Sequence, residues 1–363
     1  MKEKSLADNQ IMFWKEYSEV SLFSVLKHRA EIYGICAIWI VIFHLYRRIS
    51  MPFIPVITNI VSLGNMAVDV FLFFSGLSLF LSAEKNNYME NGWKIYYKKR
   101  ASRVLVPYLI VAIPYFLWAI IVEDGHHSVI GVLVRFIWNI SSASFWLKGV
   151  QTTWYVYAIS LFYILFPILY SYIKKENSII KILMFLAGIY LLSIIMNYTP
   201  ILRNSTIAWS RLPIFVIGIL SGKYSDKLDL SNVRRKKRNV LICLNVIFLL
   251  LSAWILSLHE IFDSFAIQPV YVWLLYGPIT LSLMIVLSII YEQCSLSVGL
   301  LRFIGGISLE IYLVHITLLH PMNYYGILKH AGNWNYLILP ICSILISIGI
   351  SEIANRILQH RRF

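Results

Sequence analysis

The sequence is poor in charged residues, and this excludes an ordinary soluble fold. Asp, Glu, Lys and Arg together make up 14% of the 363 residues, whereas soluble proteins contain about a quarter. Hydrophobic residues make up 59%, and the mean hydropathy is +0.70. Several apolar runs reach about 20 residues, the length that a helix needs to cross the core of a bilayer. We therefore expect an all-α, polytopic membrane helix bundle.

Cysteine and acidic residues are also scarce. Three of the four cysteines, Cys36, Cys243 and Cys342, lie inside apolar runs, and Cys294 has no partner near it in the sequence, so we expect no disulfide framework. The 18 acidic residues face 32 basic ones, which gives a net charge of +14. Because the basic residues fall between the apolar runs, they indicate membrane topology and not nucleic acid as a partner.

Ten membrane crossings are predicted from the apolar runs. The intervening segment 129–146 carries Arg135, Asn139 and serines, so we interpret it as re-entrant or interfacial. The ten predicted crossings are Ile32–Tyr46, Ile57–Ser82, Val104–Val122, Trp154–Ile173, Ile182–Tyr198, Ile207–Gly222, Val240–Leu258, Val270–Tyr291, Phe303–His320 and Tyr336–Ala354.

The distribution of Lys and Arg orients these spans. With the N-terminus in the cytoplasm, most of the 32 basic residues fall on the cytoplasmic side, as the positive-inside rule requires. We therefore predict a multi-pass protein of the cell membrane with both termini cytoplasmic. Residues 1–30 form a cytoplasmic or interfacial segment, 31–356 the membrane domain and 357–363 a cytoplasmic tail. Within the first segment, Ile11–Leu26 reads either as an interfacial amphipathic helix or as a poorly ordered tail.

Among the ionisable residues of the predicted spans, five are singled out: His44, Asp69, Arg211, Glu310 and His315. A charge at the bilayer centre costs at least ~2.5 kcal/mol, so each is a candidate functional residue. A neutral imidazole at His44 can accept a proton and return it, as general acid–base catalysis requires. A structural histidine that hydrogen-bonds a neighbouring helix remains the alternative.

Arg211 requires an anionic partner, because a guanidinium group keeps its proton. Asp69 and Glu310 are the available carboxylates within the membrane, and a purely structural ion pair is one reading. Arg211 also begins a helical stripe with Gly218 and Gly222, whose small size permits close helix packing. On the ninth span, Ser308, Tyr312 and His315 share one face, whereas Glu310 points elsewhere.

A basic loop, Lys94–Arg103, precedes the third span. Its Arg100 and Arg103 lie one helical turn apart and could hold a polyphosphate ligand. Such a segment could equally bind anionic lipid and set topology. From these residues alone, an enzyme and a transporter both remain open.

Six motifs, in order along the chain, resemble those of the membrane-bound acyltransferase-3 family, whose domain has ten helices. The first motif ends at His44, the third contains Arg100 and Arg103, and the last ends at His315. The motifs are EIYGICAIWIVIFH (Glu31–His44), AVDVFLFFSG (Ala67–Gly76), YYKKRASRVLVPY (Tyr96–Tyr108), TWYVYAISLFYILFP (Thr153–Pro167), RLPIFVIGIL (Arg211–Leu220) and GGISLEIYLVH (Gly305–His315).

The resemblance implies an O-acyltransferase that moves an acyl group, expected to be acetyl, from acyl-coenzyme A to a hydroxyl of a cell-surface polysaccharide or lipid-linked glycan. It implies that His44 is catalytic and that Arg29, Tyr33, Arg100 and Arg103 bind the coenzyme. Further residues are expected to shape the site or contact the acceptor, namely Asp69, Ser75, Trp154, Arg211, Glu310 and His315.

The donor, acetyl-coenzyme A, is a substrate, and we expect no bound cofactor and no metal. Membrane lipid surrounds the protein, nucleic acid is not a partner, and a homo-oligomer remains open. The alternatives are a glycan flippase or transporter without covalent chemistry, and a structural or regulatory protein derived from the same fold.

Two positions depart from the family pattern. The family commonly carries an arginine eleven residues before the histidine, and this position is Tyr33 here. Arg29, one turn earlier, is expected to replace it by extending its long side chain along the helix. The frequent glutamate of the fourth span is also missing, since Ile159 and Ser160 occupy that region.

Overall fold

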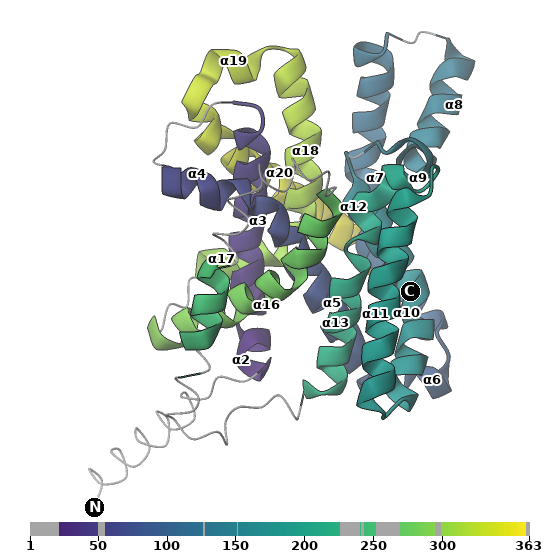
Figure 1. The fold of residues 1–363 in the computed structure, drawn as a ribbon. Helices are drawn as coiled ribbons and strands as arrows, with labels where there is room; N and C mark the ends of the chain where they lie inside the picture. Colours follow the sequence, from purple (N-terminus) through teal and green to yellow (C-terminus); the bar gives the residue numbers. More distant parts are fainter. Residues whose placement is uncertain are drawn as a thin grey trace, which may run out of the picture.

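The computed structural model describes residues 22–49, 55–125, 128–150, 152–225, 240, 243–251, 269–294 and 299–360. These residues form helices and connecting turns, without a strand among them, which confirms the all-α prediction (Figure 1). Within this part of the chain, seven helical runs are long and apolar enough to cross a membrane, or eight if one bent pair is a single span. The predicted number of ten is therefore approximate.

Most predicted spans coincide with a helix. The seventh, 240–258, lies largely outside the described residues. The helices are α3 (Arg29–Tyr46), α7 (Lys94–Trp118), α10 (Trp154–Lys175), α11 (Ile179–Tyr198), α16 (Pro269–Cys294) and α20 (Asn335–His360), which overlap the first, third, fourth, fifth, eighth and tenth predicted spans. Of the predicted N-terminal segment, the structure describes only α2 (Leu22–Lys27) and the residues next to it.

Three of the predicted spans are interrupted. The second consists of α4 (Pro55–Ser62), the 3₁₀ turn η1 (Gly64–Met66) and α5 (Ala67–Asn86). The sixth consists of η3 (Arg203–Ser205), α12 (Thr206–Trp209) and α13 (Leu212–Lys223). The ninth is bent by 72° between α17 (Gly299–Gly306) and α18 (Ser308–Tyr324). Two successive glycines end α17, and glycine is a poor helix former, so the chain turns there at little cost.

The basic segment Lys94–Arg103 is not a loop, as the sequence suggested, but the first turns of α7. It contains no glycine or proline, and Lys, Arg and Ala are good helix formers. Tyr96 secures this end of the helix, because its buried side chain donates a hydrogen bond to the carbonyl of Tyr163 on α10 at 3.0 Å. The helix therefore fixes the directions in which Arg100 and Arg103 point.

The segment that was predicted not to cross forms two short helices, α8 (Val129–Ile140) and α9 (Ala143–Lys148). The 12 residues of α8 span about 18 Å, less than the ~30 Å of a bilayer core. Figure 1 shows α8 beside the far end of α7, at the top of the view. A full crossing by α8 is thus excluded by length, and its re-entrant or interfacial placement stays a prediction.

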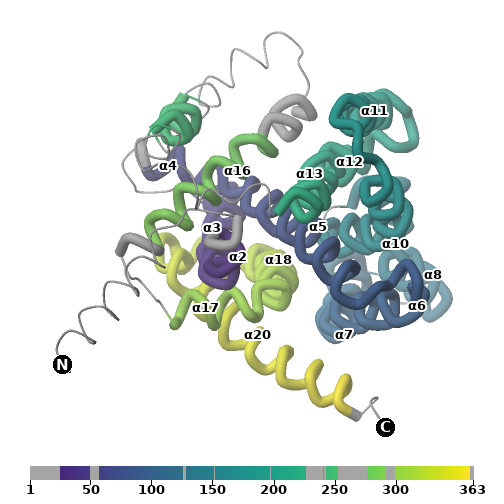
Figure 2. The backbone as a smooth tube through the Cα atoms, turned by 90° about the horizontal axis from the view of Figure 1, so that it is seen from below, coloured from purple at the N-terminus to yellow at the C-terminus, as the bar shows by residue number. Residues whose placement is uncertain are grey.

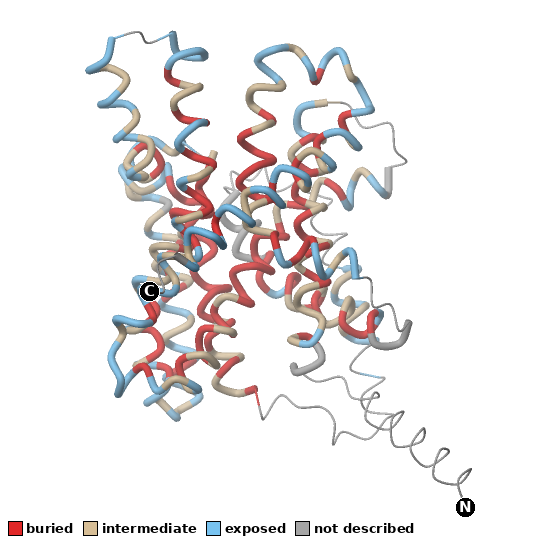
Figure 3. The backbone as a smooth tube through the Cα atoms, turned by 180° about the vertical axis from the view of Figure 1, so that it is seen from behind, coloured by how far each residue is buried: buried red, intermediate tan, exposed pale blue. Residues whose placement is uncertain are grey.

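The centre of the bundle is built on helices in direct backbone contact. A Cβ atom at Gly76 of α5 would overlap the carbonyl oxygen of Phe215 on α13, and one at Gly218 would overlap that of Phe73. The close packing predicted for the glycine stripe after Arg211 is therefore confirmed. Figure 2 shows α5 between α3 and α13, and Figure 3 shows buried residues concentrated in this central region.

Candidate functional site

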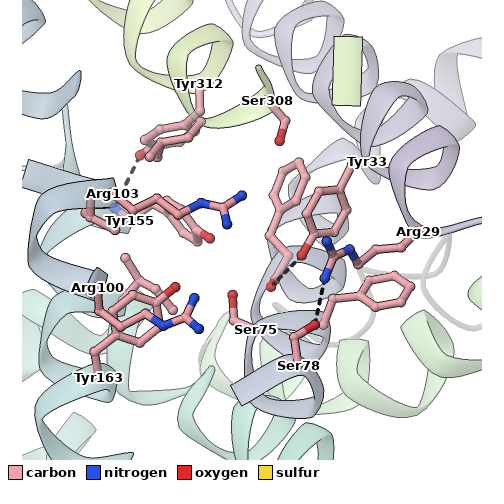
Figure 4. A pocket seen from close by; sticks show the side chains of 15 residues that line it. Arg29, Tyr33, Ser75, Ser78, Arg100, Arg103, Tyr155, Tyr163, Ser308 and Tyr312 are labelled. Carbon is pink, nitrogen blue, oxygen red and sulfur yellow. Dashed lines mark hydrogen bonds between the residues drawn. The ribbon is translucent and has the colours of Figure 1, made fainter. Parts of the chain in front are cut away.

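A cavity opens among α3, α5, α7, α10 and α18, close to the first residues of α3 and α18. Its lining is rich in polar groups, and Figure 4 shows them directed toward a common space. The polar lining residues are Arg29, Tyr33, Ser75, Ser78, Arg100, Arg103, Tyr155, Tyr163, Ser308 and Tyr312.

Three arginines dominate the charge of this cavity, and its lining contains no acidic residue. Figure 4 shows Arg100 and Arg103 of α7 on one side and Arg29 of α3 on the other. Arg29 donates a hydrogen bond from Nη1 to Ser78 Oγ at 2.8 Å, and its guanidinium carbon lies 5.8 Å from the centre of the Tyr33 ring. The Nε of Arg100 is enclosed and has no hydrogen-bond partner among the described residues. The cavity thus offers positive charge and unused donors to an anion.

All four predicted coenzyme-binding residues are brought together here. Arg29, Tyr33, Arg100 and Arg103 all line the cavity, together with Ser75, which was predicted as site-shaping. Their role in binding the coenzyme stays a prediction, but their shared location fits it. The guanidinium group of Arg29 lies beside the Tyr33 ring. This is the position at which the family commonly carries an arginine, which Arg29 was expected to replace.

Five polar lining residues were not among the predicted site residues, namely Ser78, Tyr155, Tyr163, Ser308 and Tyr312. Their spacing was the available signal. Ser78 follows Ser75 by three positions on α5, and Tyr163 follows Tyr155 by eight positions on α10. Positions three, four or eight apart lie on one helix face, so Ser78 could have been found from Ser75, whereas the two tyrosines only indicate each other.

His44 and His315 form a contact between α3 and α18 that the sequence did not predict. Nε2 of His315 lies 3.3 Å from Nδ1 of His44, and the ring centres are 5.0 Å apart. Each Nδ1 also contacts a carbonyl oxygen one turn earlier on its own helix, that of Ile40 at 2.8 Å for His44 and that of Ile311 at 2.9 Å for His315. His315 is fully buried, whereas His44 is half-buried.

The histidine pair lies behind the cavity and does not line it. Tyr312 connects the two places, because it lines the cavity and its ring centre lies 5.7 Å from that of His315. The backbone N–H of Tyr155 donates a hydrogen bond to the Tyr312 hydroxyl at 3.3 Å. Tyr33 and His44 are eleven residues apart on α3, about 16 Å along its axis. The cavity therefore ends short of His44 in this structure.

Arg211 pairs with Asp69 and not with Glu310. Nε of Arg211 lies 3.6 Å from Oδ2 of Asp69, and the side chains are 0% and 1% exposed. The guanidinium group also lies 5.0 Å from the Trp154 ring and donates a hydrogen bond from Nη1 to the carbonyl of Ile207 at 3.0 Å. Asp69, Trp154 and Arg211 thus form a structural cluster outside the cavity lining.

Glu310, which was expected to shape the site, does not line the cavity either. In the described part of the chain, His, Cys, Asp and Glu form no group of three that could hold a metal ion.

Comparison with known families settles the general activity. A family model for an acyltransferase domain, that of acyltransferase-3, matches residues 34–354. The chain belongs to the acyltransferase-3 family. This acyltransferase-3 protein is accordingly a multi-pass membrane acyltransferase, and the match includes His44, Arg100, Arg103 and His315. Comparisons with curated proteins and with solved structures gave no match.

Proposed function

We propose that this membrane acyltransferase moves an acyl group, with acetyl as the first candidate, from acyl-coenzyme A to a hydroxyl group of a cell-surface polysaccharide or lipid-linked glycan. The observation that carries the proposal is the cavity lined by three arginines and no carboxylate. Coenzyme A carries a diphosphate and a 3′-phosphate, and guanidinium groups bind such oxygens with paired, charge-assisted hydrogen bonds. Arg29, Arg100 and Arg103 take this role.

The cavity and the first turns of α7 face the cytoplasm of the cell in this proposal, with both chain termini on the same side. Support comes from Lys94, Lys98 and Lys99, which join Arg100 and Arg103 at this end of α7. Such clusters mark the cytoplasmic side of a membrane protein. Acyl-coenzyme A then enters from the compartment that supplies it.

His44 acts as the general base in the chemical step. Its Nε2 takes the proton of the acceptor hydroxyl while the hydroxyl oxygen forms a bond to the thioester carbon. The carbon–sulfur bond breaks, and the leaving thiolate recovers the proton from His44. The products are the ester and free coenzyme A, so no other reactant is consumed. In this proposal the thioester passes Tyr312, which lines the cavity and contacts His315, to reach His44.

Thiol release by the purified full-length protein tests this function. With acetyl-coenzyme A and membrane-extracted glycan, we expect free thiol to appear in equal amount to acetyl ester on the glycan. His44→Ala should lower this rate by at least ~100-fold, because the variant loses the base that takes the hydroxyl proton. His330→Ala is the matched control, since His330 is exposed on α19 (Ile327–Ala331) and should leave the rate unchanged.

Two results would contradict the proposal. Full activity of His44→Ala would remove His44 from the chemistry. Movement of labelled glycan across a vesicle membrane without thiol release would instead identify a flippase.

A further inference from the structure

The two histidines that meet between α3 and α18 have only one arrangement of protons that satisfies all their neighbours. A carbonyl oxygen accepts hydrogen bonds and cannot donate them. Nδ1 of His315 lies 2.9 Å from the Ile311 carbonyl oxygen, so this nitrogen carries the proton. A neutral imidazole has one N–H, and Nε2 of His315 therefore holds a lone pair.

The same reasoning fixes the state of His44. Its Nδ1 lies 2.8 Å from the Ile40 carbonyl oxygen and 3.3 Å from Nε2 of His315. Both neighbours are acceptors, so Nδ1 carries a proton that they share. Nε2 of His44 then holds the lone pair, and it has no hydrogen-bond partner among the described residues.

This arrangement also decides where an additional proton can go. A proton on Nε2 of His315 would point at the N–H of His44 Nδ1, and the two donors would repel each other. A proton on Nε2 of His44 meets no such conflict, because the Nδ1 proton still points at the lone pair of His315. The pair therefore takes up a proton at one atom only.

We propose that His315 is a positioning residue for His44. By accepting the Nδ1 proton, His315 orients the His44 ring, keeps its Nε2 free as the base, and stabilises the imidazolium that forms when the acceptor hydroxyl is deprotonated. A carboxylate performs this task in serine hydrolases, whereas here a neutral, fully buried imidazole does so. The inference rests on the proposed function, since it concerns the same base.

Two substitutions of His315 separate positioning from packing. The amide of Gln reaches the place of the imidazole Nε2, whereas the amide of Asn reaches only that of Nδ1. His315→Gln thus keeps an acceptor for His44, and His315→Asn loses it. We expect kcat to fall about 10- to 100-fold in His315→Asn, as for loss of a hydrogen bond to a charged group, and to stay within about threefold of the wild type in His315→Gln.

The KM for acetyl-coenzyme A should change in neither variant, because His315 does not line the cavity that holds the three arginines. An equal loss in both variants, or a rise in KM without a fall in kcat, would assign His315 to packing and overturn the inference. Unchanged kcat in His315→Asn would also overturn it. If the wild type releases no thiol, the proposed function fails first and the inference falls with it.

A second measurement does not depend on activity. Nitrogen NMR of protein labelled at its histidines reports which ring nitrogen carries a proton, and the His44 signals are assigned by their loss in His44→Ala. We expect a protonated Nδ1 and an unprotonated Nε2 for both His44 and His315. A proton on Nε2 of His44 at neutral pH would reverse the assignment and overturn the inference.

Discussion

Arg211 and the cavity arginines Arg100 and Arg103 lie in different electrostatic environments. Arg211 is 0% exposed, lies against the Trp154 ring and has the Asp69 carboxylate 3.6 Å from its Nε. Arg100 and Arg103 line an open cavity, and neither forms an ion pair among the described residues, although the Glu310 carboxylate lies close enough to Arg103 to interact with its charge. A buried arginine with its counter-ion is neutralised inside the protein, whereas an arginine without one keeps its attraction for an anion from outside. The comparison separates an arginine that holds the fold from arginines that can hold a ligand.

The largest expected effect is a loss of protein stability when the ion pair between Arg211 and Asp69 is broken. Asp69→Asn keeps the shape of the side chain but leaves the buried Arg211 charge without its counter-ion. Breaking a buried pair in this way costs about 3–5 kcal/mol, so we expect a lower melting temperature and less folded protein in detergent. The double variant Asp69→Asn/Arg211→Met should recover part of the loss. Equal stability of Asp69→Asn and the wild type would show that the pair does not stabilise the fold.

For Arg100, which lines the cavity, we expect a substitution to change the KM for acetyl-coenzyme A and not the stability of the protein. Arg100→Gln removes a donor group whose Nε is enclosed beside the cavity. Loss of a charged hydrogen bond is worth about 1.5–3 kcal/mol, so the KM for acetyl-coenzyme A should rise roughly 10- to 100-fold with little change in melting temperature.

Lys99→Gln is the matched control for this prediction. Lys99 is the preceding residue on α7, is exposed and does not line the cavity. Its substitution should leave the KM within about twofold of the wild type. If the KM rose by a similar factor in both variants, the effect of Arg100→Gln would come from the overall positive charge of the helix and not from a specific contact of Arg100 with the ligand.

Salt offers a smaller but independent test of the same comparison. The screening length falls from about 10 Å at 0.1 M salt to about 3 Å at 1 M. Because Arg103 is exposed, we expect the KM for acetyl-coenzyme A to rise severalfold over this range while the melting temperature changes little. The wild type should respond more steeply than a double Arg100→Gln/Arg103→Gln variant, and identical slopes would argue against phosphate binding by these residues.

The smallest effect is expected at an ion pair on the surface. Arg135 on α8 donates a hydrogen bond to Asp124 at 3.2 Å, and the side chains are 51% and 46% exposed. Such pairs contribute about 0–1 kcal/mol, so Arg135→Gln should shift neither the melting temperature nor the KM measurably. A marked loss of stability would mean that α8 is held by this contact.

The sequence predicted the features that depend on residue type and helical spacing. The apolar runs located the helices, and the glycines after Arg211 predicted close helix packing. Because the guanidinium group of Arg211 keeps its charge, the sequence also predicted a carboxylate partner such as Asp69. Arg100 and Arg103 were predicted to act together because they lie one helical turn apart. They do line the same cavity, although the segment that carries them is the start of α7 and not the expected loop.

The features that the sequence did not predict depend on how helices rotate against each other. His44 and His315 are 271 positions apart, and nothing in either helix alone indicates that their rings meet. For the same reason, the sequence did not show that the cavity lining stops short of His44. The bend at Ile307 was missed because apolar composition continues through it, and only the glycines before it mark the break.

That bend has an electrostatic consequence for the backbone itself. Because α18 starts afresh at Ser308, its first two residues, Ser308 and Leu309, line the cavity. The aligned peptide groups of a helix place about half a unit of positive charge at its amino-terminal end. The chain therefore contributes partial positive charge beside the cavity that does not come from the three arginines, and the Glu310 carboxylate in the first turn of α18 offsets part of it.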